Sequence, residues 1–266
     1  MRDGQAVSVP DVANQKMTGS RFEYVDLTDA RFRMVDLVNA RFHLVDMTGV
    51  KISDAELVDV DISGEIRDLR VNGVDVVPLV EAELNRRYPD RPKMRPNDAA
   101  GFREAWDILE RLWRQTVDRA RRMKPELLHE RVDDEWSFIE TQRHLVFATD
   151  AWVRRAVLGD PAPWDPLDVP HDSMRDEPAV PRNRTARPSL DEVLALRADR
   201  MATVRQVIAE LTDEKLAEMT KPITEPGYPP PESFSVRQCL EIILNEEWQH
   251  RLYAERDLTI LESRRT

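Results

Sequence analysis

Glu246 and His250, near the C-terminus, have the types and the spacing of metal ligands on a helix. The segment 245–257 holds strong helix formers and neither proline nor glycine, which predicts a helix. Residues four apart share one helix face, and the apolar stripe through Leu240 and Ile243 continues onto this pair. A carboxylate on an inward face is costly unless something pairs with it, and a divalent metal would meet that cost. The alternative is a partly exposed Glu and His at the end of a stripe.

His144 is the third candidate ligand and lies in another predicted helix, about 136–158. Its neighbours at helical spacing, such as Thr141 and Ala148, are small, which favours a histidine that lines a cavity between helices. The alternative is a hydrogen-bonded histidine at the edge of the core. Three protein ligands and an open position are usual for a catalytic metal, and helical bundles build such sites from facing helices. The sequence therefore predicts a metal site with the following ligands and no further assigned catalytic residue: His144, Glu246 and His250.

Three further residues of the C-terminal helix could take part in chemistry. Cys239 is expected to be a small buried hydrophobic residue, with a place beside the site as the alternative. Asp257 would orient a ligand histidine only if the helix packs suitably. Tyr253 is expected in the core, with a substrate hydrogen bond as the alternative.

The remaining histidines offer weaker signals. His171 lies in a long proline-rich segment and is expected to be exposed, with a lid over the site as the alternative. His43 follows a large apolar residue of a repeat and should point outward, and His129 has no evident partner. We find no glycine-rich phosphate loop in the sequence.

The composition excludes several classes of protein. A net charge of −11 over 266 residues argues against a nucleic-acid binder, whose affinity comes from Lys and Arg on phosphates. The single cysteine, Cys239, rules out an internal disulfide and suits a reducing compartment. There is no apolar signal region at the N-terminus and no apolar run long enough to span a membrane. These features predict a cytoplasmic protein that does not bind membranes.

Residues 20–62 repeat with a period of five. A large apolar residue recurs at each fifth position, and a smaller residue precedes each by two positions. The large residues are Phe22, Leu27, Phe32, Leu37, Phe42, Met47, Ile52, Leu57 and Ile62. Neither the 3.6-residue period of a helix nor the two-residue period of a strand fits, and short repeats that stack indicate a solenoid.

This pattern resembles the pentapeptide-repeat family. The resemblance implies a right-handed quadrilateral β-helix with about four pentapeptides in each coil, so that Phe22, Phe42 and Ile62 would stack. Ten acidic and five basic residues between Met17 and Ile66 would give it an acidic surface. Some larger relatives imitate DNA, but for this short module a structural role or docking of a protein partner is the stronger expectation.

The rest of the chain is predicted to be helical. A short amphipathic helix is expected at 76–88 and a proline-rich linker at 89–96, and irregular segments at 160–188 and 222–231. Long helices are predicted at about 98–123, 136–158, 189–211 and 233–262. The predicted domains are a disordered tail (1–15), the β-helix (16–75), a capping helix with linker (76–97) and a four-helix bundle (98–266).

The order of these helices, with Gln142-Arg-His-Leu145 on the second and Glu246-x-x-x-His250 on the fourth, is similar to the DinB-like superfamily. The nearest branch by ligand set includes mycothiol-dependent maleylpyruvate isomerase, although many relatives carry three histidines. The resemblance covers roughly 98–262. It implies a four-helix bundle with one divalent metal on His144, Glu246 and His250, with zinc first and nickel or manganese as alternatives.

The same resemblance implies thiol chemistry. A low-molecular-weight thiol would bind as thiolate and attack a small electrophilic substrate, giving S-transfer, conjugation or isomerisation. The β-helix would then serve docking or stability. The alternative is a non-catalytic interaction protein that uses the acidic β-helix surface, with the bundle metal structural or absent. The sequence leaves a homodimer open.

Overall fold

The computed structural model describes residues 12–133 and 135–264. The chain divides into two compact units, with the boundary between Asp54 and Ala55. Most of the predicted tail, 1–15, lies outside the described residues.

The backbone dihedral angles of the repeat follow the same period of five as its sequence. A residue with positive φ recurs at every fifth position, and these residues are Asn14, Gly19, Tyr24, Asp29, Met34, Asn39, Leu44, Gly49, Asp54, Asp59 and Gly64. Such a left-handed residue turns the chain sharply and is uncommon outside Gly, Asn and Asp. A corner every five residues is the course that a four-sided coil requires.

Alternate corners of the repeat are closed by local hydrogen bonds. The amides of Ala30 and Ala40 donate to the carbonyls three residues earlier, at 2.9 Å each. The left-handed residues inside these two turns are Asp29 and Asn39, which tolerate that conformation. At the same corners an aspartate accepts from the amide two residues on, as Asp26 does from Thr28 at 2.9 Å. The repeat therefore gains its corners from neighbouring residues rather than from distant ones.

The β-helix itself is not confirmed. Among the described residues the strands are β1 (Arg70–Val71) and β2 (Val74–Asp75), which pair as an antiparallel hairpin after the repeat. The large apolar side chains of the repeat are exposed, for example 62% for Phe22 and 59% for Phe42. The predicted stacking of residues twenty apart therefore remains a prediction.

Between the hairpin and the bundle lies α1 (Val77–Arg87), which confirms the short helix predicted at 76–88 and has a proline in its first turn. The proline-rich segment after it forms a 3₁₀-helix, η1 (Arg91–Met94). Met94 is buried in the core cluster of the bundle, and Arg91 binds Glu81 of α1 at 2.6 Å. This segment is therefore packed rather than a free linker.

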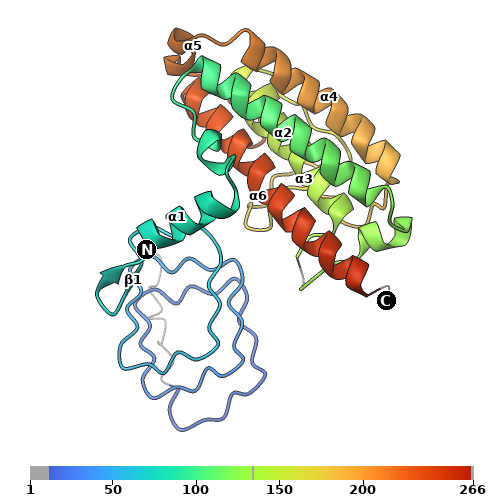
Figure 1. The fold of residues 1–266 in the computed structure, drawn as a ribbon. Helices are drawn as coiled ribbons and strands as arrows, with labels where there is room; N and C mark the ends of the chain where they lie inside the picture. Colours follow the sequence, from blue (N-terminus) through green and yellow to red (C-terminus); the bar gives the residue numbers. More distant parts are fainter. Residues whose placement is uncertain (1–11, 134, 265–266) are drawn as a thin grey trace, which may run out of the picture. The chain divides into compact units, whose positions relative to one another are not determined.

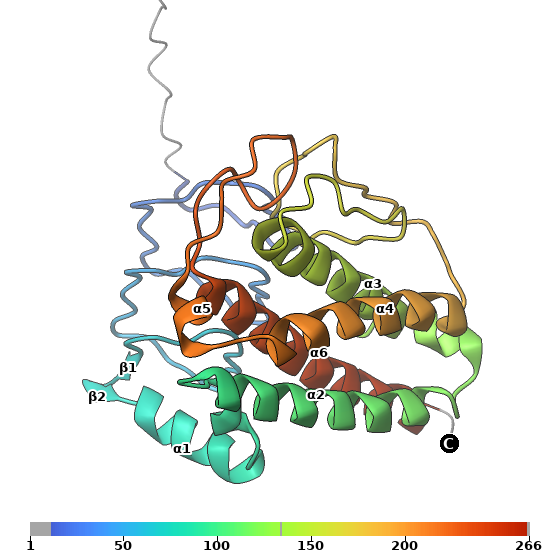
Figure 2. The same ribbon diagram turned by 90° about the horizontal axis from the view of Figure 1, so that it is seen from above.

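The second unit is built from long helices that run side by side (Figures 1 and 2). They are α2 (Ala99–Ala120), α3 (Phe138–Thr149), α4 (Leu190–Ala209) and α6 (Val236–Ser263). Their apolar faces form the core, and their first residues follow the caps Asp98, Ser137, Ser189 and Ser235. Ser189 and Glu192 form a capping box at the start of α4.

Three helical segments differ from the prediction. The second predicted helix changes after Thr149 into a π-helix, η3 (Asp150–Val157). A 3₁₀-helix, η2 (Pro125–His129), and a short helix, α5 (Asp213–Ala217), were not predicted. These segments are short or have irregular turns, so hydrophobic periodicity carries little signal for them.

Two long irregular segments, 160–188 and 218–235, lie together beside α3 (Figure 2). Aromatic contacts join both segments to α3: the ring centroids of Trp164 and Tyr228 each lie 5.9 Å from that of Phe147. Buried Arg155 of η3 donates to carbonyls of both segments. Across the described residues, no helix is long and apolar enough to cross a membrane.

Candidate metal centre

The three predicted ligands meet between α3 and α6. Nε2 of His144 lies 3.2 Å from Oε2 of Glu246, and Nε2 of His250 lies 3.0 Å from the same oxygen. Within the described residues, this is the group of His, Cys, Asp and Glu side chains that could hold a metal, with ligand atoms within 4.8 Å of one another. Two atoms bound tetrahedrally to zinc at about 2.0–2.1 Å lie about 3.3 Å apart. Both short distances are close to that value.

Val169, in the segment after η3, fixes the orientation of His144. Its carbonyl lies 2.8 Å from Nδ1 of the imidazole, which donates to it. The other nitrogen, Nε2, is then left to face Glu246. A histidine that donates one nitrogen to a carbonyl and presents the other is the usual arrangement of a metal-ligating histidine.

The charge of this cluster is incomplete without a cation. Burial by itself would raise the pKa of Glu246, but the two neighbouring imidazoles outweigh it and hold the pKa well below its usual range. The carboxylate is therefore ionised. Burial lowers the pKa of His250, so its imidazole is neutral near pH 7. Among the described residues, the basic side chains within 4 Å of the Glu246 carboxylate are these two imidazoles rather than an arginine or lysine.

Aromatic rings surround the two imidazoles. Trp136 lies 4.4 Å from the ring of His144 and stacks on His250 at 5.6 Å, while Phe147 is 5.9 Å from His144. These rings limit the positions that the imidazoles can take. The side chain of Glu246 keeps 29% of its surface exposed, so the cluster is accessible from one side.

His171 belongs to the site's surroundings, and the expectation that it is exposed was wrong. Its ring lies 5.2 Å from Tyr228 and 6.5 Å from Phe147. Burial lowers its pKa, with further effects from His144 and Glu246. Nδ1 lies 3.0 Å from the hydroxyl of Ser173, and Nε2 is buried without a hydrogen-bond partner among the described residues. The lid alternative fits this position.

The other candidate residues of the sequence take no direct part in the three-ligand cluster. Cys239 is fully buried, as expected, and burial raises its pKa to about 11. Asp257 binds its neighbour Arg256 at 2.7 Å rather than a ligand histidine. Tyr253 is 37% exposed at the rim beside His250, so the core position expected for it was wrong. His43 is exposed, like every described side chain of the repeat, so its outward direction stays a prediction. His129 ends η2 and is partly buried.

Sequence reasoning missed a buried polar cluster behind the ligands. Arg197 of α4 binds Glu247 of α6 at 2.7 Å and Gln142 of α3 at 3.3 Å, and all three are almost fully buried. The signal was present: Glu247 follows Leu240, Ile243 and Leu244 at helical spacing, which places it further inward than its neighbour Glu246.

The fold and the cluster together define the class of the second unit: a four-helix bundle with a candidate metal centre between α3 and α6. The family model of the DinB superfamily matches residues 108–254, more than half of the chain, and that of the pentapeptide repeats matches residues 26–64 in eight copies. The chain therefore belongs to the DinB superfamily and carries pentapeptide repeats, as the sequence motifs indicated. No curated protein and no solved structure matched the chain. Domains of this superfamily typically bind metal, and the His–Glu–His cluster is a candidate for that role.

Proposed function

We propose that the bundle is a divalent-metal-dependent enzyme domain that transfers or isomerises a small electrophilic substrate with the help of a low-molecular-weight thiol. The observation that carries this proposal is the carboxylate of Glu246, which faces two imidazole nitrogens at 3.0 and 3.2 Å. Three electron-rich atoms around one point need a positive charge, and a divalent ion supplies it.

Zinc is the first expectation for the ion, with nickel or manganese as alternatives. Two imidazole nitrogens and one carboxylate oxygen suit zinc and nickel, whereas manganese prefers more oxygen ligands. His144, Glu246 and His250 would hold the ion. When bound, it would act as a Lewis acid and lower the pKa of a thiol at its open position.

The protein's own side chains support a thiol that comes from solution. Cys239 is buried, and its pKa of about 11 keeps it protonated at neutral pH, so it is a poor nucleophile. Trp136 and Phe147 shield one side of the imidazoles, whereas Glu246 remains accessible. His171, with its buried Nε2, is placed to hydrogen-bond a bound ligand or substrate.

Metal content measured by elemental mass spectrometry tests the site, on full-length protein purified without a histidine tag. We expect about one divalent ion per chain in the parent and its loss in Glu246→Ala and His250→Ala. The matched control is His129→Ala, a partly buried histidine at the end of η2 that should leave the metal content unchanged. A parent that stays free of metal after incubation with zinc, nickel or manganese would contradict the proposal.

The thiol step is tested separately, on metal-loaded protein. Small thiols are incubated with electrophiles such as unsaturated carbonyl compounds, and the loss of free thiol is followed with and without protein. We expect thiol consumption by the parent but not by Glu246→Ala. If the metal binds and no thiol reacts with any electrophile, the thiol chemistry is wrong and a structural metal becomes the better explanation.

We also propose that the repeat follows the right-handed, four-sided β-helix of its family and serves to dock a protein partner or to stabilise the chain. The left-handed corner at every fifth residue from Asn14 to Gly64 supports the coil. The exposure of every side chain from 12 to 65 supports a docking role. A crystal structure without short parallel strands between these corners would refute the β-helix, and sedimentation of the full chain would decide between a monomer and a homodimer.

A further inference from the structure

Arg197 is the point at which all the long helices of the bundle are tied together. From α4 it forms an ion pair with Glu247 of α6 at 2.7 Å and a hydrogen bond with Gln142 of α3 at 3.3 Å. Its guanidinium carbon also lies 5.8 Å from the ring centroid of Trp113 of α2. Arg197, Glu247, Gln142 and Trp113 are each no more than 3% exposed. A charged pair buried this deeply is costly to build, and in several proteins such pairs fix one arrangement of the elements.

The two side chains that Arg197 binds are sequence neighbours of candidate metal ligands. Glu247 directly follows Glu246 on α6, and Gln142 precedes His144 by two residues on α3. On a helix, adjacent residues point about 100° apart, so fixing Glu247 fixes the direction in which Glu246 points. In the same way, the hydrogen bond of Arg197 to Gln142 fixes the direction in which His144 points from α3. One guanidinium thus sets the rotation of both helices that carry the candidate ligands.

We propose that Arg197 is a positioning residue of the metal centre: it orients α3 and α6 so that His144 faces Glu246 and His250. This inference rests on the proposed metal-binding function and goes beyond it, because the hydrogen bonds of Arg197 among the described residues go to Gln142 and Glu247 rather than to the three ligands. The planar guanidinium suits this role, since its separate N–H groups bind two partners in fixed directions at once.

The same helix provides a matched control. One turn along α4, Arg200 forms a second buried pair, with Asp150 of η3, through two hydrogen bonds of 2.9 Å. Arg200 is about as buried as Arg197, at 7% against 2%. Within the described part of the chain, the hydrogen bonds of Arg200 go to Asp150 and Asp199 rather than to α6, and Asp150 lies six residues beyond His144. Removing Arg200 therefore disturbs a buried ion pair without releasing a neighbour of Glu246.

The experiment compares metal affinity in Arg197→Met and Arg200→Met, measured by competition with a coloured chelator at a temperature where both variants are folded. We expect Arg197→Met to bind zinc about 10- to 100-fold more weakly than the parent, the range for lost support of metal ligands. Arg200→Met should bind like the parent. The absorption spectrum of bound Co²⁺, which reports ligand geometry, should change in the first variant alone.

The double variant Arg197→Met/Glu247→Met separates positioning from stability. Replacing both charges with apolar side chains often restores the stability that a single replacement removes. If Arg197 positions the ligands, the affinity stays low although the melting temperature recovers. An affinity that recovers with stability, or an equal loss in Arg200→Met, would overturn the inference while leaving the metal site in place. A parent that binds no metal would overturn the proposed function and this inference together.

Discussion

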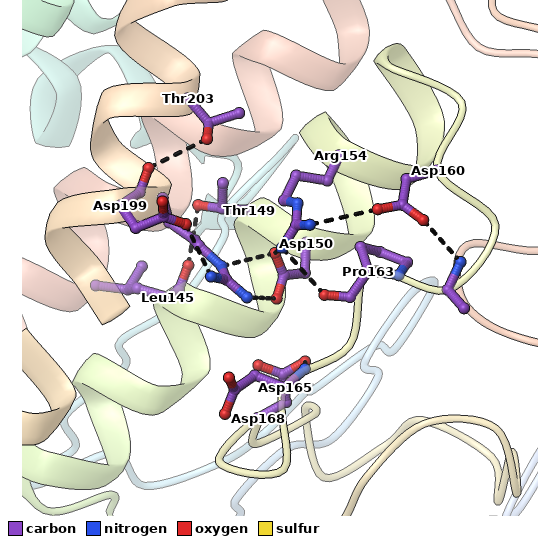
Figure 3. Close-up of polar contacts among 12 residues, drawn as sticks. Leu145, Thr149, Asp150, Arg154, Asp160, Pro163, Asp165, Asp168, Asp199 and Thr203 are labelled. Carbon is purple, nitrogen blue, oxygen red and sulfur yellow. Dashed lines mark hydrogen bonds and ion pairs between the residues drawn. The ribbon is translucent and has the colours of Figure 1, made fainter. Parts of the chain in front are cut away.

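Asp150 and Glu246 are carboxylates inside the same bundle, and they are neutralised in different ways. Asp150 accepts two hydrogen bonds of 2.9 Å from Arg200 and one of 3.2 Å from Arg154 (Figure 3). Glu246 meets the Nε2 atoms of two histidines, at 3.2 and 3.0 Å. The distances are similar, but the partners differ in charge.

The difference indicates which site is structural and which one is expected to bind an ion. A guanidinium is charged at every relevant pH, so the Asp150 site is complete within the chain. Burial lowers the pKa of His250, and no arginine or lysine pairs with Glu246 among the described residues, so the Glu246 site lacks a permanent positive charge of its own. Asp168, near Asp150 in Figure 3, is a third case: none of the arginines that the structure describes forms an ion pair with it, and its pKa, raised to about 8, keeps it protonated near pH 7.

The largest effect is expected when the Asp150 site is broken. Asp150→Ala removes the buried carboxylate that binds Arg200 and leaves this guanidinium only the exposed carboxylate of Asp199, which should lower the free energy of unfolding by about 3–5 kcal/mol. Chemical denaturation measures this loss. Metal content per folded chain should not change, because no candidate ligand is altered. A loss of metal equal to that in Glu246→Ala would remove the distinction between the two sites.

Metal binding should stabilise the parent through Glu246. At zinc concentrations 100 times the Kd, the free energy of unfolding should rise by about 2.7 kcal/mol. The rise should vanish in Glu246→Gln and persist in Asp150→Ala, relative to each variant without metal. Stabilisation of Glu246→Gln by zinc would show that the ion binds elsewhere.

The stability of the chain and its stabilisation by metal are both expected to decrease at low pH. Burial lowers the pKa of His250, so below about pH 6.5 the unfolded chain binds more protons than the folded one. The depressed pKa of Glu246 acts in the same direction at lower pH. Stability and metal binding should therefore both fall as the pH drops through this range.

The bundle was predictable from the sequence because its signals are local. Caps such as Ser189 and the apolar stripes fix the ends and faces of the long helices, and the ligand spacing on α6 is set by helix geometry. The meeting of His144 with Glu246 required the resemblance to a family, because no local pattern brings two helices together. The corners of the repeat were also local, through turn residues such as Asn39.

What the sequence did not predict depends on contacts between distant segments. Val169 lies in an irregular loop, and the role of its carbonyl exists only because that loop returns to α3. His171 was expected to be exposed for the same reason. Arg197 resembles any arginine on an amphipathic helix until the fold places it between Gln142 and Glu247.

The titration of Asp168 is expected to have a smaller effect on the free energy of unfolding. Its pH dependence is opposite to that of His250 and Glu246. Burial, and then the charge of Asp150, raises its pKa to about 8. Its Oδ2 accepts from the amide of Asp165 at 3.1 Å, while Oδ1 has no hydrogen-bond partner among the described residues. The folded chain holds a proton that the unfolded chain releases near pH 4, so stability falls as the pH rises from about 4 to 8.

Asp168→Asn keeps the shape and removes this titration. We expect the variant to be more stable than the parent at pH 8, by about 2 kcal/mol or more, and to show little gain at pH 4. Thermal unfolding at the two pH values measures the difference. An equal change at both would mean that Asp168 does not titrate in this range.

The smallest effect is expected at Glu81, which repeats the pairing of Asp150 at the surface. Its carboxylate binds Arg91 at 2.6 Å and Arg95 at 3.0 Å, but its side chain is 31% exposed. The hydrogen bond from Arg91 lowers its pKa to about 2, against the effect of burial. Water and salt screen such a pair, so Glu81→Ala should cost less than about 1 kcal/mol. Glu81 and Asp150 each pair with two arginines. The ratio of the losses in unfolding free energy on replacing each by alanine therefore measures how much burial strengthens such a pairing. Similar costs at Glu81 and Asp150 would mean that burial is not the reason the Asp150 site is strong.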